Sequence, residues 1–112
     1  MKFIVALLQI APLGNDQSRN LAKGLQYCRE AKALGADLAV FPELWNIGFN
    51  PSPTDSEGRQ AWFNSAIDQR STFFQSFAAL ARELDLNIAI TYLEAHSRRH
   101  RDGQLSRATE QR

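Results

Sequence analysis

The first 95 residues alternate between short apolar runs and longer segments in which apolar residues recur every three or four positions. Residues 3–10 form an apolar run broken only by Gln9, as expected for a strand covered on both faces of a parallel sheet. Residues 37–41 and 87–93 have the same character. The pattern therefore predicts three buried strands.

A first helix is predicted between the first two strands. Turn-forming residues precede it, and either Asp16 or Ser18 can serve as its N-cap. Gly35 lies where such a helix usually ends. Its predicted buried face consists of Leu21, Leu25, Cys28 and Ala31.

The strongest helical pattern begins at Ser71 or Thr72. Its apolar stripe consists of Phe73, Phe77, Leu80 and Leu84, widened by Phe74 and Ala81. Residues 46–55 are rich in turn formers and are expected to be a loop, and residues 56–64 are expected to form a short helix.

The resulting order is β-α-β-α-β, with a short helix inserted after the second strand. A strand, a helix of ordinary length and a second strand make a βαβ unit, whose strands run parallel through a right-handed crossover. We therefore predict an α/β fold with a largely parallel sheet.

Composition narrows the class of protein. A chain of 112 residues is one domain at most, and its 44% hydrophobic and 22% charged residues are ordinary for a globular protein. The net charge of +1 indicates no polyanionic partner, and the single cysteine excludes an internal disulfide. No apolar run approaches the roughly 18 residues of a membrane span. The N-terminal run is interpreted as a core strand rather than a signal peptide, and we expect a cytoplasmic protein.

Composition changes abruptly after Ala95. Residues 96–112 carry a net charge of +3, whereas residues 1–95 carry −2. This last stretch contains both histidines and shows neither helical nor strand periodicity. We therefore divide the chain into residues 1–95, a partial folded domain, and residues 96–112, a basic tail that is disordered or foreign to the fold.

Glu43 follows the second predicted strand directly, after Pro42. One interpretation is structural, because proline followed by an acidic residue commonly begins a helix. The other is functional, because ligands of open α/β sheets bind beyond the carboxyl ends of the strands. A carboxylate among Phe41, Leu44 and Trp45 would be partly desolvated, which favours a general base.

The segment GADLAVFPELWNIGF (residues 35–49), preceded by an apolar strand ending at Gln9 and a helix, resembles the N-terminal part of the nitrilase or carbon–nitrogen hydrolase superfamily. The segment ARELDLNIAITYLEA (residues 81–95) is similar to the same family. The resemblance covers about residues 3–95. It implies that Glu43 occupies the position of the family's catalytic glutamate.

The resemblance further implies an αββα sandwich and hydrolysis of non-peptide carbon–nitrogen bonds in amides, carbamoyl groups or nitriles. Family members use a Glu-Lys-Cys triad without metal or organic cofactor, and they are usually homo-oligomers. Cysteine attacks the carbon to form a thioester, glutamate takes the thiol proton and later activates water, and lysine stabilises the oxyanion.

Only the glutamate can be matched in this sequence. The family lysine follows the third strand, whereas the lysines here (Lys2, Lys23 and Lys32) all precede Glu43. Cys28, the one cysteine, lies on the apolar face of the first predicted helix and is interpreted as a core residue. Substrate-binding residues stay unknown, and no metal site is predicted.

Several other residues have a structural interpretation. Trp62 and Phe63 are expected in the core or an interface. Glu94 resembles a second acid of the family, although a solvated acid at a strand end is equally consistent. His96 and His100 are four residues apart but lack further metal ligands. The tail arginines support only weak attraction to phosphates, so no specific nucleic-acid partner is predicted.

Two function hypotheses follow. The first is a truncated carbon–nitrogen hydrolase that keeps the general base Glu43 and is inactive alone, which leaves open whether the chain is itself an enzyme. The second is a non-catalytic α/β module that self-associates through an open sheet edge and an uncovered apolar face.

Overall fold

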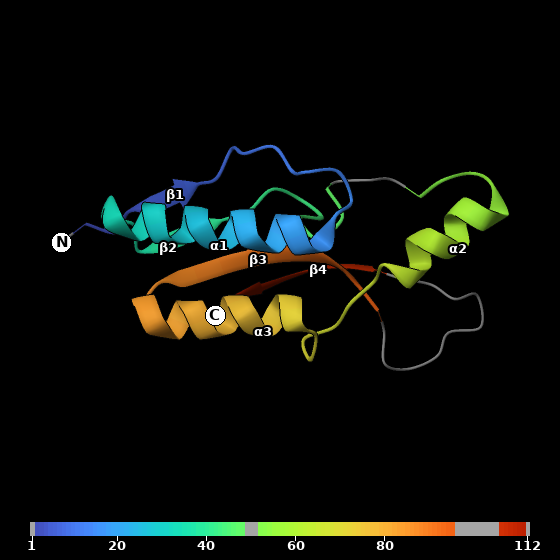
Figure 1. Cartoon of the computed structure of the whole chain (residues 1–112). Helices are drawn as coiled ribbons and strands as arrows, with labels where there is room; N and C mark the ends of the chain where they lie inside the picture. Colours follow the sequence, from blue (N-terminus) through green and yellow to red (C-terminus); the bar gives the residue numbers. More distant parts are fainter. Residues whose placement is uncertain (1, 49–51, 96–105, 112) are drawn as a thin grey trace.

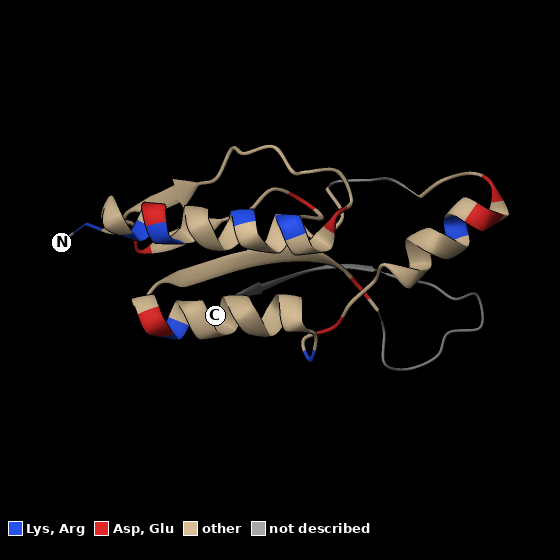
Figure 2. Cartoon of the chain, in the orientation of Figure 1, with Lys and Arg blue, Asp and Glu red and all other residues tan. Residues whose placement is uncertain are grey.

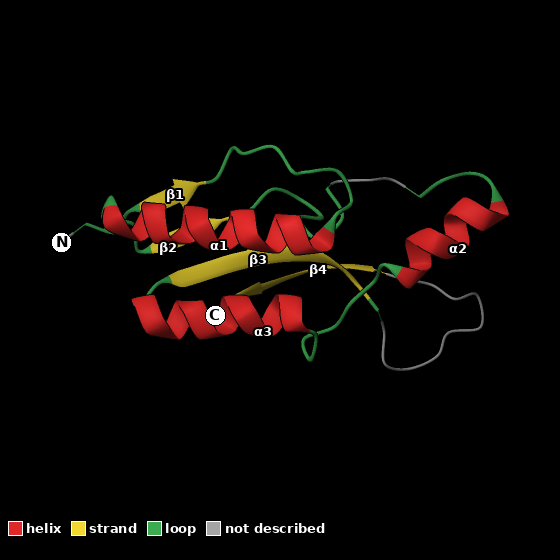
Figure 3. Ribbon diagram, viewed as in Figure 1, coloured by secondary structure: helices red, strands yellow, loops and turns green. Residues whose placement is uncertain are grey.

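The computed structural model describes residues 2–48, 52–95 and 106–111, the last group by its backbone alone. It contains a four-stranded sheet in the order β1-β2-β3-β4 and three helices (Figures 1 and 3). The strands are β1 (Val5–Leu7), β2 (Leu38–Val40), β3 (Asn87–Glu94) and β4 (Ser106–Gln111). The helices are α1 (Gln17–Ala33), α2 (Ser56–Asn64) and α3 (Thr72–Leu84).

The predicted α/β class and element order are confirmed. β1 pairs with β2, and β2 with β3, in parallel, with Ala6 opposite Ala39 and Ala39 opposite Ile88. β4 pairs antiparallel with β3. β4 lies within residues 96–112, for which the sequence predicted neither a helix nor a strand. Residues 96–105, including both histidines, lie outside the described residues. The division into residues 1–95 and 96–112 stays a prediction.

Local sequence fixes where the helices begin. The Asp16 carboxylate accepts a hydrogen bond from the Arg19 N–H at 3.1 Å, and the Ser71 hydroxyl accepts one from the Phe74 N–H at 3.1 Å. Each cap satisfies a backbone donor that has no partner within the helix. Gly35 follows α1 with a φ of 96°, a left-handed conformation that glycine adopts without a steric penalty.

α1 and α3 lie on the same face of the sheet (Figure 1). The core between them and the strands is built from alternate strand residues, among them Ala39, Ile88 and Ile90, and from Cys28 and Phe77 of the helices. The predicted helix faces are confirmed, although Leu21, Leu25 and Leu84 are only partly buried. None of the described helices is long and apolar enough to cross a membrane.

The face of β1 that points away from α1 and α3 is exposed, so the expectation of a strand covered on both faces is wrong in this structure. β1 is also shorter than residues 3–10, and Phe3 and Leu7 are 65% and 66% exposed. Both large described helices pack on the other face of the sheet. β1, β2 and β3 carry no charged residue except Glu94 at the end of β3 (Figure 2).

Candidate active site at the carboxyl end of strand β2

The candidate site is the turn that follows β2. β2 ends at Val40, and residues 43–48 form a continuous turn in place of a helix. Glu43 is therefore three residues beyond the end of β2 and two beyond the core residue Phe41, and lies at the carboxyl end of the parallel strands. The interpretation of Pro42 and Glu43 as a helix start is wrong, since the next helix begins at Ser56.

Glu43 is exposed, whereas its neighbours Phe41, Leu44 and Trp45 are buried. The expected partial desolvation of this carboxylate is thus not found in this chain. The apolar neighbours are buried in the core, whereas the Glu43 side chain between them stays exposed.

Leu44 has a positive φ of 53°, which is uncommon for a bulky residue. Its carbonyl oxygen accepts hydrogen bonds from the N–H groups of Ile47 at 3.2 Å and Gly48 at 2.9 Å, and these close the turn. Gly48 also has a positive φ, and a Cβ there would lie 2.2 Å from the Gly14 carbonyl oxygen. Glycine is therefore required at position 48.

The Thr91 hydroxyl of β3 joins the strand to this turn. It accepts a hydrogen bond from the Trp45 N–H at 3.2 Å and donates one to the Pro42 carbonyl oxygen. The two bonds bracket Glu43 and Leu44 in the chain. One side chain of the central sheet thus fixes both ends of the segment that carries the candidate base.

Two fully buried asparagines secure the same turn. Asn46 accepts a hydrogen bond from the Leu93 N–H at 3.0 Å, and its own carbonyl oxygen accepts one from the Asn20 amide at 3.2 Å. Asn20 further accepts a bond from the Leu13 N–H at 2.7 Å and donates one to the Gly14 carbonyl oxygen. Among the described residues, every buried side-chain nitrogen or oxygen has a hydrogen-bond partner.

Trp45 lies at the junction of these elements. Its indole N–H donates to the Asn20 carbonyl oxygen at 2.9 Å, and its ring is 5.5 Å from that of Phe41. A Cβ at Gly24 would lie 2.7 Å from the Phe77 ring and 3.0 Å from both Phe41 and Trp45. Glycine on α1 therefore allows the aromatic residues to pack against the helix backbone.

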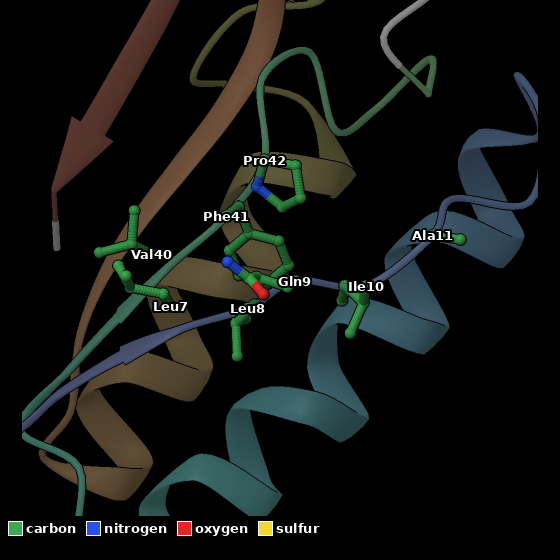
Figure 4. A pocket seen from close by; sticks show the side chains of 8 residues that line it. All are labelled: Leu7, Leu8, Gln9, Ile10, Ala11, Val40, Phe41 and Pro42. Atoms are coloured by element: carbon green, nitrogen blue, oxygen red, sulfur yellow. The ribbon is translucent and has the colours of Figure 1, made fainter.

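An open cavity of about 510 Å³ lies at the carboxyl ends of β1 and β2 (Figure 4). Residues 7–11 and 40–42 line it, so it ends at the residue that precedes Glu43. Gln9 supplies the one polar side chain among the eight that line the cavity. A mostly apolar cavity with a few polar groups at strand ends is the usual setting for a small-molecule site.

The thiol of this chain is not placed for nucleophilic attack. Cys28 is fully buried in the core between α1 and the sheet, as predicted. Burial raises the pKa of the Cys28 thiol from 9.0 to about 12, so the thiolate is scarce at neutral pH. Cys28 is thus a small core residue.

Two of the lysines are engaged along α1. The Lys23 ammonium donates to the Ala11 carbonyl oxygen at 2.5 Å, and the Lys32 ammonium donates to the Asp85 carbonyl oxygen at 3.3 Å. Both bonds fasten α1 to neighbouring segments of the chain. Neither partner belongs to the turn at Glu43, so these bonds have a structural role.

Of the remaining predicted residues, Trp62 and Phe63 are partly buried, and their rings pack edge to face with centroids 5.6 Å apart. Trp62 also packs against a small cluster formed by Leu44, Ile47 and Leu93. Glu94 is half-buried at the end of β3. The described part of the chain contains no group of three potential metal ligands.

The sequence as a whole matches a known family. The family described as carbon-nitrogen hydrolase matches residues 4–108, which is most of the chain. The chain belongs to the carbon–nitrogen hydrolase family. The match extends beyond Ala95, past the end of the resemblance seen in the sequence motifs.

Relatives of this carbon–nitrogen hydrolase chain include an aliphatic nitrilase from Sinorhizobium fredii (strain HH103). It is 32% identical over 104 residues, and the match covers 83% of the chain and 34% of the nitrilase. An amidase from Nesterenkonia sp. has the same fold, with a TM-score of 0.56 at 20% identity over 86% of the chain and 33% of the amidase.

A glutamine-dependent NAD⁺ synthetase from Acinetobacter baumannii is also similar in structure, with a TM-score of 0.60 and 25% identity. The match covers 96% of the chain and 18% of the synthetase. The chain thus spans about a third of the nitrilase and of the amidase, and less of the synthetase. These neighbours confirm the predicted nitrilase-like fold class.

The sequence interpretation of this carbon–nitrogen hydrolase chain singled out Glu43 but missed the residues that hold its turn. Asn20 and Asn46 are fully buried, and Thr91 is 9% exposed. Asn20 lies eleven residues, about three helical turns, before Ala31 of the predicted apolar face, so a buried polar residue could have been suspected there. Asn46 and Thr91 gave no such signal, because their partners are 19 or more residues away in sequence.

Proposed function

We propose that this chain is part of a carbon–nitrogen hydrolase and that Glu43 is its general base. The proposed reaction is hydrolysis of a non-peptide carbon–nitrogen bond in an amide, a carbamoyl group or a nitrile. The observation that carries the proposal is the position of Glu43 directly beyond the carboxyl end of β2, on a turn held by buried hydrogen bonds. The cavity lined by residues 7–11 and 40–42 adjoins this turn, and a cavity at this place supports the proposal.

The proposed role of Glu43 is proton transfer. For an amide, its carboxylate accepts the thiol proton of a cysteine nucleophile as the sulfur attacks the substrate carbon, and it returns that proton to the nitrogen, which leaves as ammonia or an amine when the thioester forms. The carboxylate then takes a proton from the water that attacks the thioester and gives it back to the departing cysteine sulfur, so that the acid is released. An ammonium group stabilises the tetrahedral oxyanion. The buried Cys28 and the lysines bonded along α1 do not fit these two roles, and Lys2 precedes β1. In this proposal the thiol and the ammonium therefore come from residues outside this sequence.

We therefore infer that the 112-residue chain alone does not hydrolyse amides or nitriles. Purified chain would be incubated with an aliphatic amide and with an aliphatic nitrile, and ammonia release would be measured. The expected result is release equal to the protein-free blank, for both the wild type and Glu43→Gln. Turnover by the wild type that Glu43→Gln abolishes would overturn the inference of inactivity.

A second candidate function, self-association, is favoured by the exposed apolar face of β1. Val5 and Leu7 of β1, which forms one edge of the sheet, are exposed, as is Phe3 just before this strand. Such a face and edge favour pairing with a second copy of the chain. Size-exclusion chromatography with light scattering is expected to give a homo-oligomer, and Leu7→Lys is expected to shift it toward monomer. A wild-type monomer at all concentrations would exclude this candidate.

A further inference from the structure

We propose that Thr91 and Asn46 are positioning residues, which hold Leu44 in its left-handed conformation and so fix the backbone from which Glu43 projects. The proposal rests on the proposed function, in that Glu43 is taken as the general base. Neither residue carries a charge. Both lie within the segments that resemble the family, Asn46 in residues 35–49 and Thr91 in residues 81–95, but their role is inferred from three-dimensional contacts.

The first step is the conformation of Leu44. Its φ of 53° lies in the left-handed region, where the Cβ of an L-residue crowds the backbone. Such residues persist only where the surrounding structure over-determines them, and they cluster at functional sites. Leu44 is buried and immediately follows Glu43. Its conformation therefore needs a source of restraint close by.

Thr91 supplies the restraint on both sides of the strained residue. Its hydroxyl accepts from the Trp45 N–H at 3.2 Å, just after Leu44, and donates to the Pro42 carbonyl oxygen, just before Glu43. A single oxygen on β3 thus bonds to the two peptide groups that enclose Glu43 and Leu44. A backbone rotation at either residue would break at least one of these bonds.

Asn46 restrains the far side of the turn. Its side-chain oxygen accepts from the Leu93 N–H at 3.0 Å, and its amide lies 3.4 Å from both the Gln17 side-chain oxygen and the Ser65 carbonyl oxygen. The side chain is fully buried, so water does not replace these bonds. Thr91 and Asn46 therefore connect the turn to two positions of β3, on either side of Tyr92.

Nuclear magnetic resonance of the full chain tests the proposal through the three-bond HN–Hα coupling and the ¹³C shifts of Leu44, which report its φ. Thr91→Val removes the hydroxyl and keeps the branched shape, whereas Thr91→Ser keeps the hydroxyl. Thr54→Val, at an exposed loop position, is the matched control.

We expect a left-handed Leu44 in the wild type, in Thr91→Ser and in the control. Thr91→Val should lose the left-handed signature and exchange the Trp45 amide hydrogen about tenfold faster or more, because its acceptor is gone. The proposal is overturned if Leu44 stays left-handed in Thr91→Val with the Trp45 amide equally protected, or if Thr91→Ser fails to restore both signals.

Two further measurements keep the test decisive if Thr91→Val does not fold. In the wild type, the amide hydrogens of Trp45 and Leu93 must exchange as slowly as those of central β3, since side-chain oxygens accept from them. Fast exchange at either amide overturns the proposal. Glu43→Gln must leave the Leu44 signature unchanged, and a change would assign the restraint to the carboxylate instead.

These signals report conformation and not turnover. The NMR signals can show that Thr91 and Asn46 do not hold the turn even if Glu43 is a general base. Conversely, an activity assay can show that Glu43 is not a general base even if Thr91 and Asn46 hold the turn. The two proposals are therefore tested separately.

Discussion

The side-chain amide of Asn20 on α1 donates a hydrogen bond to the carbonyl oxygen of Asn46, 26 residues away, at 3.2 Å, and both residues are fully buried. This contact joins the first helix to the turn that carries Glu43. A buried amide without hydrogen-bond partners is energetically costly, and a different docking of α1 would leave this amide unpaired. The pair therefore both stabilises the fold and specifies how α1 docks against the turn.

Asn20→Ala is expected to destabilise the chain by about 2–3 kcal/mol. The substitution leaves the Leu13 N–H without its acceptor and the Asn46 carbonyl oxygen without a donor. Urea unfolding followed by Trp fluorescence measures the change. Asn64→Ala, at an exposed site at the end of α2, is the control and should stay within about 0.5 kcal/mol. Equal effects of the two substitutions would contradict a structural role of the buried amide.

Gly24→Ala is expected to destabilise the chain by about 1 kcal/mol or more, although alanine favours a helix over glycine by about 1 kcal/mol. The added methyl group would lie 2.7 Å from the Phe77 ring and 3.0 Å from Phe41 and Trp45, and all three rings are buried. A lowered thermal midpoint checks this, with Gln26→Ala on the exposed face of α1 as the control. A raised midpoint for Gly24→Ala would show that the aromatic packing is loose.

Stability is expected to fall between about pH 9 and pH 12 through Cys28. The pKa of its thiol is raised by burial to about 12 in the folded chain and is 9.0 in the unfolded reference, so the unfolded chain loses this proton first. In this window the folded state is therefore disfavoured by up to about 1.4 kcal/mol per pH unit. Below pH 9 the thiol makes no such contribution.

The measurement is the difference in unfolding free energy between the wild type and Cys28→Ala across this pH range, which cancels the tyrosine and lysine titrations. The difference should shrink or reverse in sign as the pH rises. A constant difference would mean that the Cys28 thiol titrates normally in the folded chain. Because Cys28 is buried, iodoacetamide at pH 8 should alkylate its thiol only in chains that have unfolded, so the rate of alkylation should follow the unfolding of the chain.

Local sequence signals predicted the elements of this fold because those signals are short-ranged. The caps Asp16 and Ser71 lie within three residues of the amides they satisfy, and the apolar stripe of α3 repeats over its own length. Each helix could therefore be placed without knowledge of its neighbours. The same holds for Cys28, whose burial follows from its place on the α1 stripe.

Features that depend on distant segments were missed or wrong. The exposed face of β1 and the exposure of Glu43 depend on which layers cover the sheet, and an apolar run does not encode that. A turn follows β2 where one of the two interpretations of Pro42 and Glu43 had a helix start, because Thr91 and Asn46 stabilise the turn through β3, more than 40 residues away. β4 was not predicted because residues 106–111 have no apolar alternation and gain their strand conformation by pairing with β3.

The assignment of Glu43 as the general base is tested most directly in a chimera. In it, residues 4–108 of this chain replace the matching third of the aliphatic nitrilase from Sinorhizobium fredii, and the remaining residues are those of the nitrilase. Ammonia release from an aliphatic nitrile is then compared for the chimera and its Glu43→Gln variant, with Glu57→Gln, at an exposed acid of α2, as the control.

If Glu43 is the general base, Glu43→Gln should lower kcat about a hundredfold or more while Glu57→Gln leaves it unchanged. An active chimera in which Glu43→Gln turns over the nitrile as fast as the parent would contradict the assignment.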